Sequence, residues 1–251
     1  MKLKAGSSLL RFAALLAVAL VALQLYFALR IALMAVVDPA STTFQRSEIW
    51  RLLSERGSFS WSQRWVDERR ISDNLKRAVI ASEDSGFAEH TGVDWDALEK
   101  AWERNQKAQT RAEAASARVD AKAARKAPPK VIGGSTITQQ LAKNLFLSGE
   151  RNLPRKAQEF ILTFMLEAML DKRRILEIYL NSVEWGEGIF GAEAAAQHYF
   201  HTSAAQLTPM AAARLAVMLP APKRFEKRPD SPYLMSRAAT VNARMGAVEL
   251  P

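Results

Sequence analysis

Four carboxylates and one histidine fall within residues 83–94, directly after a short apolar stretch. A carboxylate at the end of an apolar helix loses hydration, which raises its pKa and suits a general base. The segment therefore offers a candidate general base. A capped junction between two helices explains the same spacing without any chemistry, so both interpretations stay open at this level. His90 is more typical of a structural residue that bonds to the backbone.

A second group follows the glycine pair at 133–134. The pair predicts a turn, with Ser135 as the N-cap of a helix over residues 136–147. Backbone N–H groups at a helix start attract phosphate, and Lys143 adds a positive charge about two turns further on. The segment is not a P-loop, because the pattern GxxxxGK[ST] is absent.

A third group consists of Arg155, Lys156 and Glu159, with Arg151 one turn earlier. Spacings of three and four residues place the first three side chains on one helix face. Such cations can form a cradle for a diphosphate, because the planar fork of arginine matches phosphate oxygens. A surface ladder of salt bridges is the ordinary alternative.

A fourth pattern, the glycines at 186, 188 and 191, matches GxGxxG. Dinucleotide binding requires a strand before this pattern and an acidic residue downstream, whereas a helical sequence precedes it here. The glycines are therefore expected to shape a loop beside the cleft.

Apolar periodicity places these groups on a mainly helical domain with at most a small sheet. Residues 103–130 are rich in Ala, Lys and Arg and present no apolar stripe, which predicts a solvated or mobile helical insertion, although a charged linker fits equally well. Helices are expected over 74–82, from Asp94 through Trp102, over 136–147, from Pro154 onward, and over 175–180, 192–200 and 208–220.

The N-terminus is predicted to be a membrane anchor. Residues 12–29 contain one polar side chain, Gln24, and span about 27 Å as a helix. Lys2, Lys4 and Arg11 precede the span, so the positive-inside rule keeps the N-terminus cytoplasmic. A cleaved signal peptide is the alternative, but the apolar run is long for one. The expected organisation is a cytoplasmic tail (1–11), a transmembrane anchor (12–37), a membrane-proximal segment (38–70) and a catalytic domain (71–251).

The composition excludes several classes of protein. The 251 residues include no Cys, which excludes a disulfide scaffold, a thiolate metal centre and a cysteine nucleophile. Only three His are present, which argues against a histidine-rich metal site. The net charge of +9 permits a non-enzymatic alternative, a scaffold that binds nucleic acid or anionic lipid.

Four longer motifs, taken in order, resemble glycosyltransferase family 51, the peptidoglycan glycosyltransferases. They are EDSGFAEHTGVD, GGSTITQQLAKNLFL, RKAQE and RRILEIYLNSVEWGEGIFGAEAAAQHYF. The resemblance covers roughly residues 70–225. The SxxK and KTG elements of a penicillin-binding domain are not found, so the chain is similar to the stand-alone form. Residues 103–130 depart from the family, in which this stretch is shorter.

The resemblance implies a fold and a set of roles. The fold is a lysozyme-like α+β glycosyltransferase domain, mainly α, with a small membrane-proximal lobe and one N-terminal transmembrane helix before it. Glu83 takes the place of the general base and Glu159 that of a second essential glutamate. Lys143 and Arg151 are the best candidates for direct diphosphate contact. The implied substrate-binding residues are Asp84, Phe87, Ser135, Gln139, Gln140, Lys143, Asn144, Arg151, Arg155 and Lys156.

The resemblance also implies the reaction, in which lipid II is polymerised into β-1,4-linked glycan and undecaprenyl diphosphate is released during cell-wall biosynthesis. The expected location is the inner membrane, with the catalytic domain in the periplasm. Expected partners are lipid II, the growing lipid-linked glycan strand, the membrane and proteins of cell-wall synthesis or division, with no nucleic acid. No cofactor or protein-bound metal is expected to be required, although Mg²⁺ stimulation is compatible with carboxylates beside a diphosphate.

A membrane-anchored, lysozyme-like enzyme that cleaves glycan is the main alternative. It too would use an acidic residue in a helical fold. It does not need the basic cradle, so the cations around Arg155 argue against it.

Overall fold

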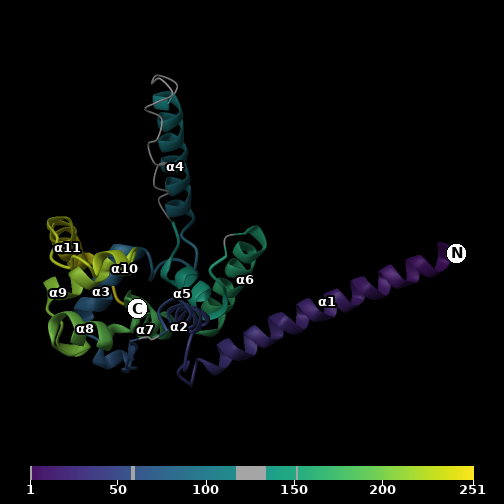
Figure 1. Ribbon diagram of the computed structural model, residues 1–251, viewed down its shortest axis with the longest axis horizontal. Helices are drawn as coiled ribbons and strands as arrows, with labels where there is room; N and C mark the ends of the chain where they lie inside the picture. Colours follow the sequence, from purple (N-terminus) through teal and green to yellow (C-terminus); the bar gives the residue numbers. More distant parts are fainter. Residues whose placement is uncertain (1, 58–59, 117–133, 151) are drawn as a thin grey trace.

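The computed structural model describes residues 2–57, 60–116, 134–150 and 152–251. Helices dominate the described residues, and the strands form one small sheet. The predicted fold class, mainly α with one apolar N-terminal helix, is confirmed. Two long helices, α1 (Lys2–Leu33) and α4 (Trp95–Ser116), extend away from a helical body in different directions (Figure 1).

Two groups of helices make up that body. One contains α3 (Asp73–Glu83), α9 (Pro209–Met218) and α11 (Pro232–Arg244), and the other contains α2 (Thr43–Arg56), α5 (Ile137–Phe146), α6 (Leu153–Met169) and α7 (Lys172–Ser182). A continuous apolar core runs through both groups. The remaining elements are α8 (Ala192–Phe200), α10 (Pro222–Phe225) and the 3₁₀ helices η1 (Glu68–Arg70), η2 (Ala204–Gln206) and η3 (Met245–Ala247).

The sheet has the order β1–β3–β2, formed by β1 (Ser62–Gln63), β2 (Glu184–Gly186) and β3 (Ile189–Phe190). β1 runs parallel to β3, and β2 runs antiparallel to it. Gly188, between β2 and β3, has φ +75°, and a Cβ there would lie 2.1 Å from the Ser60 carbonyl oxygen. The sequence predicts a loop at these glycines, and the structure has a tight hairpin between β2 and β3 there.

Capping residues explain where the site helices begin. Asp94 accepts a hydrogen bond from the Ala97 N–H at 2.8 Å, so the predicted cap of α4 is confirmed. Pro154 lies in the first turn of α6, also as predicted. The N-cap of α5 is Thr136 and not Ser135, because Thr136 forms a capping box with Gln139.

The sequence analysis does not predict two helices that the structure contains. α2 lies within the expected membrane-proximal segment, and α11 follows the last predicted helix. Residues 103–116 continue α4, whereas 117–130 lie outside the described residues.

Helix α1 is long and apolar enough to cross a membrane. Its span, Ser8–Leu33, has a mean hydropathy of 2.4. The end nearest the body joins the domain, because Ile31 and Met34 are buried in the core. Further out, the amides of Gln24 on α1 and Gln158 on α6 exchange two hydrogen bonds of 2.9 and 3.0 Å. Helix α1 therefore contacts α6, the helix that carries Arg155, Lys156 and Glu159.

Candidate active site

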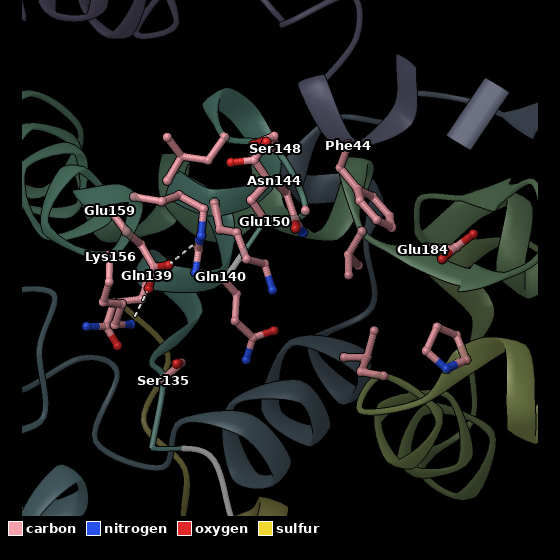
Figure 2. A pocket seen from close by; sticks show the side chains of 17 residues that line it. Phe44, Ser135, Gln139, Gln140, Asn144, Ser148, Glu150, Lys156, Glu159 and Glu184 are labelled. Carbon is pink, nitrogen blue, oxygen red and sulfur yellow. Dashed lines mark hydrogen bonds and ion pairs between the residues drawn. The ribbon is translucent and has the colours of Figure 1, made fainter. Parts of the chain in front are cut away.

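A cavity of about 430 Å³ lies between α5, α6 and the start of β2. This size is within the range of ligand pockets, roughly 300–1,000 Å³. Helices α5 and α6 therefore bring together the second and third sequence motifs. The predicted site residues that line the cavity are Ser135, Gln139, Gln140, Lys143, Asn144, Arg155, Lys156 and Glu159 (Figure 2).

The basic cradle on α6 is held together by Glu159. Arg155 Nη1 lies 3.0 Å from Glu159 Oε2, and Lys156 Nζ contacts the other carboxylate oxygen, as the dashed lines in Figure 2 show. Glu159 is only 3% exposed, so this is not a surface ladder of salt bridges. Arg155 Nε is buried and has no hydrogen-bond partner among the described residues.

Glu83 ends α3 and reaches the cavity wall through Gln140. The amide nitrogen of Gln140 donates to Glu83 Oε2 at 3.0 Å. Burial raises the pKa of Glu83, and the nearby charge of Asp84 raises it further, while hydrogen bonds from Gln140 and Ser82 lower it. The net result is a raised pKa, which a general base that works near neutrality requires.

Tyr179 on α7 orients that amide. Its hydroxyl donates to Gln140 Oε1 at 2.9 Å. An ionised carboxylate only accepts hydrogen bonds, so the Gln140 end facing Glu83 must be the amide NH₂, which leaves the carbonyl for Tyr179. Burial, with the charges of Glu83 and Asp84, raises the pKa of Tyr179 well above its usual value, so the hydroxyl stays protonated. Sequence reasoning missed Tyr179, because no local spacing connects it to Glu83.

Both carboxylate oxygens of Asp84 are engaged within the protein, and its predicted substrate contact stays a prediction. One carboxylate oxygen lies 2.8 Å from His90 Nε2, and the other accepts the Ile137 N–H at 2.9 Å. His90 Nδ1 in turn accepts the Gly92 N–H, which confirms the backbone-bonding role predicted for this histidine. Asp84 therefore fixes the start of α5 against the end of α3.

Phe87 and Gln139, also predicted to bind substrate, have structural contacts of their own. Phe87 is completely buried, with Lys172 Nζ 4.5 Å from its ring centre, so Phe87 belongs to the core and not to the cavity. Gln139 lines the cavity, but its amide oxygen accepts the Thr136 N–H within the capping box. Its first role is to shape α5. Arg151, predicted to contact the diphosphate, lies outside the described residues.

Glu184 is a cavity residue that sequence reasoning missed. It begins β2 and is only 5% exposed. Burial raises its pKa to about 7, with Lys223 lowering it and Glu48 raising it. The sequence gives no signal for this, because an acidic residue beside a tryptophan and a glycine is ordinary in a surface turn.

No group of three or more His, Asp or Glu side chains gathers into a metal site within the described residues. The expectation about Mg²⁺ stays a prediction.

The fold and the cavity together define a class of protein. A helical domain attached to an apolar N-terminal helix places a carboxylate of raised pKa near a cationic pocket. This arrangement fits an enzyme that transfers a group away from an anionic leaving group.

The comparisons with known proteins then identify the family. The Transglycosylase family model matches residues 51–118 and 117–246. The chain is 50% identical over 239 residues to a biosynthetic peptidoglycan transglycosylase of Paraburkholderia xenovorans (strain LB400), covering 95% of this chain and 91% of that protein. It is 52% identical over 245 residues to the protein of the same name from Cupriavidus metallidurans (strain ATCC 43123 / DSM 2839 / NBRC 102507 / CH34), covering 94% and 95%. The chain therefore belongs to the Transglycosylase family, and the resemblance seen in the sequence is confirmed.

Proposed function

We propose that this chain polymerises lipid II into β-1,4-linked glycan, with Glu83 as the general base and the cavity as the site of the donor diphosphate. As a member of the Transglycosylase family, the chain is a peptidoglycan glycosyltransferase of cell-wall synthesis. One observation supports the residue roles above all others: Gln140 lines the cationic cavity and at the same time donates a hydrogen bond to the carboxylate of Glu83.

The acceptor sugar is activated by Glu83. Its carboxylate takes the proton from the 4-hydroxyl of the incoming N-acetylglucosamine. The oxygen attacks the anomeric carbon of the donor from the face opposite the diphosphate, so that an α-linked donor gives a β-linked product. The bond from that carbon to the diphosphate oxygen breaks, and its electron pair leaves with the diphosphate. General-base assistance of this kind contributes about 10²–10⁴-fold to the rate.

The leaving diphosphate gains negative charge in the transition state. Lys143 on α5 and the Arg155–Lys156 pair on α6 line the cavity where this charge develops. Glu159 orders the pair by contacting both cations. Preorganised cations stabilise the transition state more than the ground state, which lowers the barrier. Arg151 is proposed to contact the same diphosphate.

The membrane anchor adds a concentration effect. Confinement to the bilayer that holds the lipid substrate raises the effective substrate concentration. The proposed location is the bacterial inner membrane, with the N-terminus cytoplasmic because basic residues precede the span. The catalytic domain then lies in the periplasm, where proteins of cell-wall synthesis or division are the proposed partners.

The deciding experiment follows labelled lipid II with the purified full chain and its Glu83→Gln variant. We expect Glu83→Gln to lower polymerisation by about 10²–10⁴-fold while undecaprenyl diphosphate still binds, because the variant keeps its hydrogen-bonding capacity and loses only the base. Glu89→Gln, at an exposed acid in the same segment, is the matched control and should remain active. Near-normal turnover by Glu83→Gln would refute the base assignment.

The same assay separates the alternative functions. A lytic enzyme shortens finished glycan, whereas a polymerase lengthens it and releases undecaprenyl diphosphate. A scaffold gives salt-sensitive binding to nucleic acid or anionic lipid that survives loss of both Glu83 and Glu159, without polymerisation.

A further inference from the structure

The cavity has two ends of opposite character. At one end lie the cations of α6, and at the other lies Glu184, which Figure 2 shows well apart from Lys156 and Glu159. Phe44 lies on the same side of the cavity as Glu184 in Figure 2, and the cavity lining also includes the apolar side chains of Val183, Leu219 and Pro222. This end suits a neutral ligand and disfavours an anionic one.

Glu184 is buried, and it shares its cation partner Lys223 with a second carboxylate. Among the described residues no hydrogen bond reaches its Oε1 atom. The nearest cation, Lys223 Nζ, lies 3.5 Å away and also contacts Glu48. A buried carboxyl without donors is costly, so its presence beside a cavity requires an explanation.

The groups around Glu184 do not remove this cost. Glu48 on α2 and Glu226 after α10 are acidic, and their charges oppose ionisation of Glu184. Arg51, also on α2, is engaged by Glu48, Glu55 and Glu187. The Tyr199 hydroxyl on α8 donates to the Trp185 carbonyl oxygen and not to Glu184. A ligand in the cavity could therefore supply a further hydrogen-bond donor to this carboxylate.

We propose that Glu184 is a sugar-binding residue, which accepts a hydrogen bond from a hydroxyl or acetamido N–H group of the lipid-linked glycan. This inference rests on the proposed function, because it needs the diphosphate to occupy the cationic end of the same cavity. A ligand with an anionic group at one end and neutral sugars at the other then fits in one direction only. The aromatic ring of Phe44 and the apolar side chains of Val183 and Leu219 offer surfaces for the C–H faces of the sugar rings.

The test compares two ligands that differ only in the sugars. A lipid-linked tetrasaccharide and undecaprenyl diphosphate are titrated against the full chain in detergent, in a Glu83→Gln background that prevents turnover. We expect Glu184→Ala to weaken tetrasaccharide binding by about 10–100-fold, the effect of a lost hydrogen bond to a charged group. Undecaprenyl diphosphate should bind within about twofold of the parent.

Two further variants separate a loss of sugar binding from a general effect on folding or charge. Glu184→Gln keeps the size and an acceptor oxygen, so it should fold and show a smaller loss. It should also lack the gain in tetrasaccharide affinity that the parent shows as Glu184 ionises on raising the pH from 6 to 8. Glu187→Gln removes a neighbouring carboxylate that pairs with Arg51 and is not part of the cavity wall, so it should bind both ligands normally.

Three results would overturn the inference: unchanged tetrasaccharide affinity in Glu184→Ala, an equal loss for both ligands, or the same loss in Glu187→Gln. The first shows that Glu184 does not contact the sugars. The second and third show a general effect on folding or charge. If the parent binds neither ligand, the proposed function fails together with this inference, whereas normal binding of undecaprenyl diphosphate leaves the proposed function intact.

Discussion

Removing the Tyr179 hydroxyl should move the pH dependence of catalysis. In Tyr179→Phe, Gln140 loses the 2.9 Å hydrogen bond that orients its amide toward Glu83. The amide then donates to Glu83 for less of the time, so the ionised carboxylate is less stable and its pKa rises further. Because the carboxylate is the active form of a general base, activity is lost at a higher pH on the acid side.

The size of the shift follows from the Gln140–Glu83 contact. A hydrogen bond to a charged group contributes about 1.5–3 kcal/mol, which corresponds to roughly 1–2 pKa units. Gln140→Leu removes the 3.0 Å hydrogen bond to Glu83 entirely. The acid limb of its pH–activity profile should therefore move to higher pH by that amount. Tyr179→Phe leaves the Gln140 amide in place but no longer oriented, so we expect the pKa of Glu83 to rise by a smaller amount, about half a unit to one unit. Activity of Tyr179→Phe on the alkaline plateau should stay close to that of the parent, because Tyr179 does not line the cavity.

The assay is kcat/KM for lipid II polymerisation between pH 5 and 9. Tyr199→Phe is the matched control, because it also deletes a hydroxyl that donates at 2.9 Å to an internal oxygen, far from Glu83 in the chain. It should lower the free energy of unfolding to a similar extent without moving the acid limb. An acid limb that stays in place in both Tyr179→Phe and Gln140→Leu would show that these residues do not tune the base.

The remaining predictions concern stability and metal. Burial raises the pKa of Glu184 from 4.5 to about 7, so the folded protein binds more protons than the unfolded chain and its free energy of unfolding falls as the pH rises through this window, by up to about 3 kcal/mol. Glu184→Gln should therefore raise the Tm more at pH 8 than at pH 5, and an equal change at both would contradict the assigned burial. Phe87→Ala should cost about 3–5 kcal/mol in denaturant unfolding while the KM of the folded fraction stays within about twofold, whereas a stable variant with a raised KM would return Phe87 to the binding residues. Chelation of divalent ions with EDTA should leave polymerisation measurable and Mg²⁺ should only stimulate it, so complete and Mg²⁺-reversible loss would show a required metal.

Local patterns in the sequence were sufficient for the elements that depend on neighbouring residues. The Arg155–Lys156–Glu159 cluster follows from helical spacing alone, because side chains three and four residues apart share a face. The apolar span within α1 and the cap of α4 at Asp94 are local in the same sense. α2 was missed because it carries no clear apolar stripe, and it is held by a capping box and by contacts with the rest of the domain.

Only the tertiary structure decided which of the acidic and aromatic residues face the cavity. Glu83 owes its raised pKa to burial, and it meets Gln140 across 57 positions of sequence. Phe87, four residues from Glu83, turns into the core, whereas Glu184, about a hundred residues away, joins the cavity wall. Spacing along one helix determines which side chains are neighbours on that helix. Hydration and electrostatic environment depend on every element packed around a group, and no local pattern encodes that packing.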